Sequence, residues 1–181
     1  MLVYRTDKNG IWTGEAREIG PKDGRARNEV PHDPPQLSEG QFAQWRGRVW
    51  VVLDAYPVEP VRRDKLADLA HKRWQVETGG ITASGVAIQT DRASQSMVTS
   101  AALAAQLGPE MKIRWKTASG DFVALDAAQI VGIATLVRLH VQNCFGHEAD
   151  LTALIAAAET VADLDAIDIN AGWPDEVEIS E

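Results

Sequence analysis

The stretch RWQVETGGITASGVAIQTDRASQSM, residues 73–97, decides how the second half of the chain folds. Its two adjacent glycines, Gly79-Gly80, separate a segment with helical spacing from one in which apolar and polar residues alternate. Glycine is a poor helix former, so the pair predicts a break in the chain. The alternation predicts a hairpin over Val76–Thr90 that turns at Ser84-Gly85.

The polar residues Thr90, Asp91, Arg92 and Ser94 follow this hairpin and raise the question of a catalytic site. A structural role accounts for them more simply. The side-chain oxygen of Asp91 or Thr90 can accept hydrogen bonds from the free N–H groups of a first helical turn, which predicts a helix that starts at Arg92. We expect the helix to end near Gly108-Pro109. Its predicted apolar stripe consists of Ala93, Met97, Ala101 and Ala105.

The same design recurs over residues 111–126, MKIRWKTASGDFVALD, where alternation on both sides of Ser119-Gly120 predicts a second hairpin. Asp126 is predicted to cap a long helix, which we expect Gly146 to interrupt. A short final helix is expected to start at Thr160. The apolar face predicted for the long helix consists of Ile130, Ile133, Ala134, Val137, Val141 and Cys144.

The N-terminal third has a different character, with short alternating segments joined by glycine, proline and asparagine. One hairpin is predicted to turn at Asn9-Gly10 and a second at Arg46-Gly47, because these residues tolerate the positive φ angles of tight turns. The connection between the two hairpins holds four of the eight prolines, which excludes a central strand there.

These elements predict the α+β class: a small antiparallel β module at the N-terminus, followed by a helical domain with two β-hairpins. The predicted boundaries are residues 1–57 for the β module, 58–62 for a linker, 63–174 for the α+β domain and 175–181 for an acidic tail.

Length and composition are those of an ordinary globular protein, with 181 residues, 45% hydrophobic and 24% charged. The net charge of −8 at pH 7 argues against a general nucleic-acid binder, which would carry a basic patch. The single cysteine, Cys144, excludes an internal disulfide. We recognise no signal peptide and no membrane span, so synthesis in the cytoplasm is expected.

His140, Cys144 and His147 fall at positions i, i+4 and i+7, where an unbroken helix would present three zinc ligands on one face. Two features favour a structural role instead. Cys144 belongs to the apolar stripe, where a free cysteine behaves as a small buried hydrophobe, and Gly146 weakens the helical geometry. We therefore predict no metal site and no cofactor.

Nucleophilic catalysis has no positive support in the sequence. The Gly-x-Ser-x-Gly pattern of a nucleophile elbow is absent. His71 falls beside Lys72 and Arg73 on a helix face that we expect to be solvated. No catalytic residue is predicted, and the chain is not expected to be an enzyme.

Six tryptophans are many for a chain of this length, and Trp12, Trp45 and Trp50 crowd into the N-terminal module. They either pack between the hairpins or form, with Tyr56, an exposed surface for a protein partner or a glycan, because aromatic side chains supply flat area at low entropic cost. The remaining three are expected to pack in the second domain: Trp74, Trp115 and Trp173.

Four stretches then occur in order: RWQVETGGITASGVAIQTDRASQSM, IRWKTASGDFVALDAAQ, LHVQNCF and VADLDAIDINAGWP. Together, over about residues 63–174, they resemble a domain family of unassigned function found in tailed bacteriophages and prophages, often beside tail-fibre genes. The earlier PPQLSEG and AQWRGRVWVV segments are similar to small Trp-containing hairpin modules of tail-fibre and fibre-assembly proteins.

The resemblance implies a non-enzymatic protein of a phage or phage-derived tail. We expect it to be a structural accessory or an assembly factor that is made in the cytoplasm of a bacterial host, contacts tail-fibre or tail-tip proteins and resides in the virion tail. One alternative is a fibre-assembly chaperone that is absent from the mature particle. Another is a carbohydrate-binding module for a host surface glycan. A homo-oligomer is compatible with each of these roles.

Overall fold

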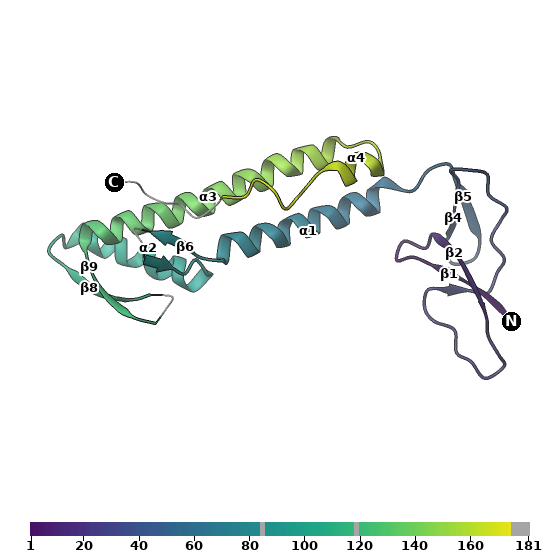
Figure 1. The fold of residues 1–181 in the computed structure, drawn as a ribbon, viewed down its shortest axis with the longest axis horizontal. Coiled ribbons are helices and arrows are strands. Elements are labelled where there is room, and N and C mark those ends of the chain that lie inside the picture. The colour runs from purple at the N-terminus through teal and green to yellow at the C-terminus, as the bar shows by residue number, and fades with distance from the viewer. Residues whose placement is uncertain (84–85, 118–119, 175–181) are drawn as a thin grey trace. The chain divides into compact units, whose positions relative to one another are not determined.

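The computed structural model describes residues 1–83, 86–117 and 120–174. The chain divides into two compact units, which are described separately below. The N-terminal unit comprises Met1–Arg63 with Glu159–Ala162, and the C-terminal unit comprises Asp64–Ala158 with Asp163–Glu181. The class is α+β, as predicted, with small antiparallel sheets first and helices interleaved with two β-hairpins after them (Figure 1).

Two small sheets build the N-terminal unit. Strands β1 (Leu2–Thr6), β2 (Trp12–Glu18) and β3 (Glu29–Val30) form an antiparallel sheet in the order β2-β1-β3. Strands β4 (Phe42–Trp45) and β5 (Trp50–Leu53) form the second predicted hairpin. The core between them is small, which is typical of a module this short: Val3, Ile11, Ile19, Val30 and Ala43 are buried.

The turn at Asn9-Gly10 forms as predicted and also joins the two sheets. Gly10 has φ +77° and its carbonyl accepts a hydrogen bond from Trp45 N at 2.8 Å. The Asp7 carboxylate accepts from the N–H groups of Asn9 and Ile11 at 2.8 and 2.9 Å. The hairpin loop is therefore held from both sides by hydrogen bonds.

Helix α1 (Val58–Thr78) corrects the predicted linker, because residues 58–62 are its first turns. Pro60 is compatible with this position, since the N–H groups of a first turn have no intrahelical acceptor to lose. The helix also extends past Trp74 and takes up Val76–Thr78, so the prediction that these residues belong to the hairpin is wrong. The chain breaks at Gly79-Gly80 as expected, with Gly80 at φ +99°.

The next hairpin pairs β6 (Ile81–Ala83) with β7 (Val86–Ile88), and its predicted turn at Ser84-Gly85 lies outside the described residues. Helix α2 (Arg92–Leu107) follows. Asp91 is its N-cap, accepting from the N–H groups of Ala93 and Ser94, and Gly108 is its C-cap.

The apolar stripe predicted for α2 is only partly correct. Ala105 is buried and Ala101 packs against the core, but Ala93 is exposed and Met97 is 56% exposed. The helix instead buries Ser94, Val98 and Ala102 together with Ala105. The helix is rich in alanine and serine, which are small enough to lie on either side, so the pattern of residue types does not define the buried face.

Strands β8 (Lys112–Lys116) and β9 (Phe122–Asp126) form the second hairpin of this unit; Ser119 of its predicted turn lies outside the described residues. Helix α3 (Ala127–Ala157) starts with a capping box between Asp126 and Gln129. It runs through Gly146 without interruption, contrary to the prediction, because one helical glycine costs only about 1 kcal/mol. Helix α4 (Val161–Ala166) follows Thr160 as predicted.

The core of the C-terminal unit lies between α2, α3 and one face of each hairpin (Figure 1). Trp115 packs against it as predicted, and Trp173 is buried, but Trp74 is 49% exposed, which corrects its predicted packing on the long helix. The buried members are Ile81, Ile88, Val98, Ala102, Ala105, Leu125, Ala127, Ile130, Ile133 and Val137. None of the helices within the described ranges has both the length and the apolar character needed to cross a membrane.

Candidate functional site

Trp45 and Trp50 are the two predicted contact residues that the structure brings together. They are directly paired across β4 and β5, and their ring centroids lie 5.3 Å apart at an interplanar angle of 62°. Both side chains are half-buried. Trp45 and Trp50 are therefore neither fully buried nor fully exposed. They lie between the two alternatives that the sequence leaves open, packing between the hairpins and an exposed contact surface.

His32 completes an aromatic cluster that the sequence does not predict. Its ring stacks on Trp45 with centroids 5.2 Å apart and an interplanar angle of 19°. Its carbonyl accepts a hydrogen bond of 2.9 Å from the indole Nε1 of Trp50. We call His32, Trp45 and Trp50 the aromatic cluster; its position is fixed by the strand pair and by the proline-rich connection.

Trp12 and Tyr56, the other predicted contact residues, lie outside this cluster. Trp12 packs edge-on against Tyr4, with ring centroids 6.3 Å apart. Tyr56 packs edge-on against Phe42 and donates its hydroxyl to the Asp7 carboxylate at 2.5 Å. Burial, and then the neighbouring carboxylate, raise the pKa of the Tyr56 hydroxyl, so it stays protonated and holds the first hairpin loop.

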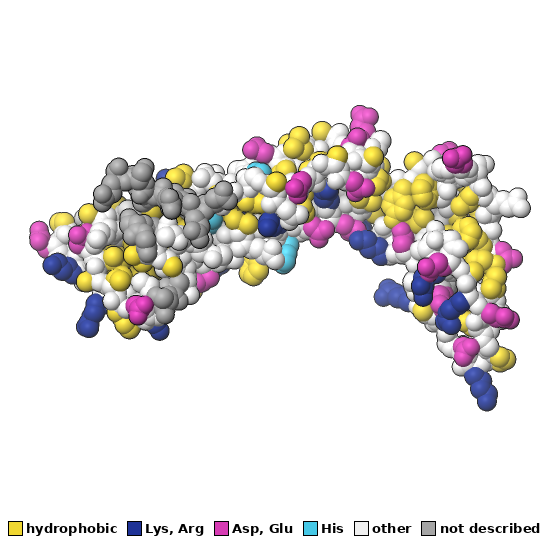
Figure 2. All heavy atoms as spheres, viewed as in Figure 1, with side chains coloured by type: hydrophobic (Ala, Val, Ile, Leu, Met, Phe, Trp, Pro, Cys, Tyr) yellow, Lys and Arg dark blue, Asp and Glu magenta, His cyan; other side chains and the backbone are white. Residues whose placement is uncertain are grey.

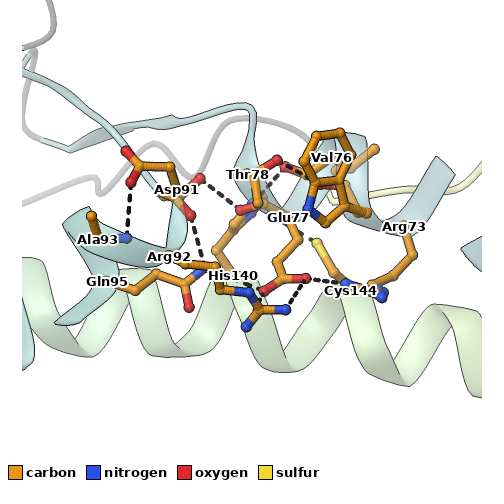
Figure 3. Close-up of polar contacts among 12 residues, drawn as sticks. Arg73, Val76, Glu77, Thr78, Asp91, Arg92, Ala93, Gln95, His140 and Cys144 are labelled. Atoms are coloured by element: carbon orange, nitrogen blue, oxygen red, sulfur yellow. Dashed lines mark hydrogen bonds and ion pairs between the residues drawn. The ribbon is translucent and has the colours of Figure 1, made fainter. Parts of the chain in front are cut away.

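The C-terminal unit contains a network that the sequence does not reveal, centred on the fully buried carboxylate of Glu77 in the last turn of α1 (Figure 3). Arg73, one turn earlier, forms an ion pair with it. Arg92 approaches from the start of α2, with Nη1 3.0 Å from Oε1, and Gln95 donates to Oε1 at 3.2 Å. We call Glu77, Arg73, Arg92 and Gln95 the Glu77 network.

Arg73 differs from the prediction, which places it on a solvated face. Its side chain is only 15% exposed. Besides pairing with Glu77 it forms an ion pair with Glu148 at 3.2 Å, and its guanidinium lies 4.6 Å from the ring centroid of Phe145. Arg73 therefore connects α1 to α3 and also balances the negative charge of Glu77.

Thr90 joins the end of α1 to the hairpin. Its buried hydroxyl donates to the carbonyl of Glu77 at 2.6 Å and accepts from Gly80 N at 2.9 Å. One side chain thus satisfies two of the backbone groups that the break at Gly79-Gly80 leaves without a helical partner.

The spacing that could have held zinc does not produce a shared site. His140 and Cys144 are buried neighbours, with Nε2 and Sγ 3.8 Å apart, and His140 Nε2 lies 3.1 Å from the carbonyl of Val76 (Figure 3). His147 contacts the carbonyl of Ala171 instead, at 2.9 Å. In the described parts of the chain, no three His, Cys, Asp or Glu side chains cluster closely enough to hold a metal ion.

Cys144 is placed for packing, and its environment disfavours the thiolate. Burial raises the pKa of the thiol to about 11, and the charge of Glu77 adds to this effect. Since the thiolate is the reactive form, Cys144 is a poor nucleophile in this position. Its burial agrees with the predicted apolar stripe.

A hollow of about 440 Å³ lies beside the Glu77 network. Among the described residues of its lining, Asp91 is the one titratable side chain; the Ser94 hydroxyl, and then the N–H groups that it accepts from, lower its pKa. The Asp91 carboxylate thus serves to cap the start of α2. The lining residues are Thr78, Gly79, Gly80, Ile81, Thr82, Ala87, Ile88, Gln89 and Asp91.

The comparison with protein families agrees with the segment predicted to carry the resemblance, residues 63–174. The model of DUF4376, a domain of unknown function, matches residues 60–171. No curated protein and no solved structure matches the chain. Since the matched residues extend from the first turn of α1 past α4 and make up more than half of the sequence, the chain belongs to the DUF4376 family.

Proposed function

We propose that this protein is a non-enzymatic component of a bacteriophage or phage-derived tail, and that it binds a tail-fibre or tail-tip protein through the aromatic cluster. The tail assignment rests on the resemblance of residues 63–174 and of the N-terminal hairpins to tail-fibre-associated proteins. The contact assignment rests on one structural observation: Trp45 and Trp50 are held in place while remaining half-exposed.

The fixed positions of the rings in the aromatic cluster support a binding role. The rings are already fixed by the Trp45–Trp50 pair and by the hydrogen bond from Trp50 to His32, so little side-chain entropy is lost when a partner binds. Tryptophan is also the residue type enriched at the energetic centres of protein interfaces. Val49, which is 59% exposed, extends the apolar surface next to Trp50. Hydrophobic side chains gather over β4 and β5 in Figure 2.

The ring geometry favours a protein partner over a glycan. Sugar rings stack on an open, flat aromatic face, whereas His32 already covers one face of Trp45. Trp45 and Trp50 are also inclined by 62°, so they do not form one coplanar platform. An uneven apolar surface of this kind suits interdigitation with protein side chains.

Co-expression with the tail-fibre proteins of the same genome, followed by affinity capture, tests the proposal. We expect co-purification that is lost in His32→Ala, which opens the stack without removing a core residue, and in Trp50→Ala. Trp74→Ala is the matched control, because Trp74 is a half-exposed tryptophan of the C-terminal unit. Capture unaffected by Trp50→Ala in a folded chain would refute the contact.

Analysis of purified particles separates the two roles within the proposal. A structural accessory remains in the particle and is detected there by mass spectrometry. A chaperone is absent from it, although fibre assembly fails without it. Glycan-array binding by the wild type that is lost in Trp50→Ala, without fibre binding, would overturn the proposal in favour of a carbohydrate-binding module.

A further inference from the structure

The outward side of α2 lacks the charged residues that solvated helix faces carry. Residues 93–107 read ASQSMVTSAALAAQL, without one charged side chain, in a chain that is 24% charged. Three large apolar side chains are nevertheless exposed there: Met97 at 56%, Leu103 at 60% and Leu107 at 83%. A face with this composition is more typical of a helix that packs on both sides.

A regular seam runs along the centre of this outward side. Ser96, Ser100, Leu103 and Leu107 are all exposed and are spaced by four, three and four residues. This alternation keeps the four residues on one line along a helix and is the spacing of the contact positions in coiled coils. The side chains of the seam are small in its N-terminal half, where they are serines, and large in its C-terminal half, where they are leucines.

Covering the seam would leave few polar groups without partners. The hydroxyl of Ser100 donates to the carbonyl of Ser96 at 2.9 Å, and that of Thr99 donates to the carbonyl of Gln95 at 2.8 Å. On α3, the hydroxyl of Thr135 donates to the carbonyl of Val131 at 2.9 Å. Because these donors are already satisfied within their own helices, the desolvation cost of an interface is low.

A groove of about 380 Å³ between α2 and α3 lies beside the seam and would widen such an interface. Leu103 and Ala102 form its apolar side on α2, and Val131 and Ala134 form it on α3. The groove belongs wholly to the C-terminal unit and contains Thr99, Gln106, Thr135 and Arg138 as its polar lining.

We propose that this face binds a second copy of the chain, with the two α2 helices antiparallel about a two-fold axis. In that arrangement Ser96 lies opposite Leu107 of the other copy, and Ser100 lies opposite Leu103, so each large side chain faces a small one. A parallel pair would place leucine against leucine and serine against serine, leaving the helices unevenly spaced. The small and large side chains of one seam therefore match those of the other only when the two helices run in opposite directions.

Charge limits the part of the surface at which a second copy could bind. Each chain carries a net charge of −8, so two copies repel through most of their surface. The outward side of α2 contributes nothing to that repulsion. The seam extends from Ser96 to Leu107, about 16 Å along the helix, and the adjoining groove would add to the contact area.

Sedimentation-velocity analysis of the full chain over a concentration series tests self-association. We expect a dimer for the wild type and at least about a tenfold weaker association for the double variant Leu103→Glu with Leu107→Glu, because the seam would then enclose four carboxylates without counter-charges. Phe122→Glu is the matched control: Phe122 is 69% exposed on β9, outside α2, and its replacement should leave the dimer intact. Unchanged circular dichroism would show that the variants fold.

A wild type that remains monomeric at about 100 µM would overturn the proposal. So would a dimer that persists in the double variant, or one that dissociates equally in Phe122→Glu. Since the seam and the aromatic cluster share no residue, Trp50→Ala should stay dimeric, and failure of the proposed fibre contact would leave this result unaffected.

Disulfide cross-linking tests the antiparallel direction. We expect a mixture of Ser96→Cys chains and Leu107→Cys chains to form a cross-linked heterodimer, and Ser96→Cys alone to remain uncross-linked, because its two copies would lie about 16 Å apart along the helices. The native Cys144 is fully buried and does not compete. Efficient cross-linking of Ser96→Cys alone would refute the antiparallel pairing.

Discussion

Glu29 and Glu77 are buried glutamates, one in each unit, and both are paired with arginine. Glu29 lies on the short strand β3, and its partner Arg17, on β2 of the same sheet, is 47% exposed. Glu77 instead receives Arg73, which is 15% exposed, together with Arg92 and Gln95 from another helix. The N-terminal unit thus pairs its buried carboxylate with one partly exposed arginine. The C-terminal unit pairs its own with a largely buried arginine, Arg73, and with Arg92, which is 61% exposed.

The difference in surroundings sets what each charge contributes. A pair that keeps one partner in water is screened, and its loss is partly replaced by solvent. Arg92 is 61% exposed and can likewise be solvated, but Arg73 is only 15% exposed, so removing the Glu77 carboxylate leaves one largely buried positive charge. We therefore expect the C-terminal unit to depend on its network more steeply than the N-terminal unit depends on Arg17–Glu29.

The strongest test of this comparison is Glu77→Gln, which preserves the shape of the side chain and removes its charge. We expect the free energy of unfolding of the C-terminal unit to fall by about 3 kcal/mol, because Arg73 loses its nearest counter-charge. Urea denaturation followed by circular dichroism measures this change. Glu59→Gln, which breaks an ion pair whose Glu59 side chain is 81% exposed, should cost less than about 0.5 kcal/mol. Equal effects of the two substitutions would contradict the comparison.

Thr90→Val probes the hydroxyl that closes the helix end. The carbonyl of Glu77 and the N–H of Gly80 would both lose their partner in a buried position, for an expected loss of about 2 kcal/mol in the free energy of unfolding. Thr90→Ser retains the hydroxyl and serves as the control in the same urea titration. If Thr90→Ser is the more destabilising variant, packing of the methyl group matters more than the two hydrogen bonds.

Gly172→Ala and Gly14→Ala compare two glycines with positive φ, one in each unit. Gly172 has φ +79°, and a Cβ there would lie 2.9 Å from Cε1 of His147. Gly14 has φ +84°, and a Cβ there would meet no described atom within 4 Å, so alanine at this position meets backbone strain alone. We expect a loss of about 1 kcal/mol for Gly14→Ala and a larger loss for Gly172→Ala. Differential scanning calorimetry should resolve the two; equal losses would mean that the His147 ring moves aside freely.

The smallest change in stability is expected when acid protonates Glu29 and weakens its ion pair with Arg17. The hydrogen bonds from Arg17, and then from Ala26 N, lower the pKa of Glu29 from 4.5 to about 2. Because the folded value lies below the unfolded one, the pair stabilises the fold above pH 4.5 and loses this contribution as the pH falls towards 2. The indole N–H signals of Trp45 and Trp50 report on this unit in NMR spectra during an acid titration. Glu29→Gln should flatten the acid dependence; an unchanged titration would exclude Glu29 as its source.

Local signals in the sequence predict much of the fold. The caps at Asp91 and Asp126, the break at Gly79-Gly80 and the turn at Asn9-Gly10 each act on backbone groups within a few residues, so their chemistry can be read from neighbours along the chain. The prediction at Gly146 is wrong, because a single glycine weakens a helix by less than the packing on both sides of it contributes.

The candidate site is predicted only in part. The Trp45–Trp50 contact follows from the register of the β4–β5 hairpin, which the alternation in the sequence indicates. His32 lies in a proline-rich connection without periodicity, so no pattern points to its stack on Trp45. The sequence does not indicate the seam of α2, since its pattern assigns Met97 to the buried stripe.

The sequence by itself determined the turn at Asn9-Gly10, the break at Gly79-Gly80 and the caps at Asp91 and Asp126, because these features depend on φ preferences and on hydrogen bonds between near neighbours. Only the tertiary structure decided that Glu77 and Arg73 are interior. The buried Glu77 carboxylate needs partners from another helix, Arg92 and Gln95 of α2. The sequence does not indicate these partners, because the β6–β7 hairpin separates them from Glu77 along the chain.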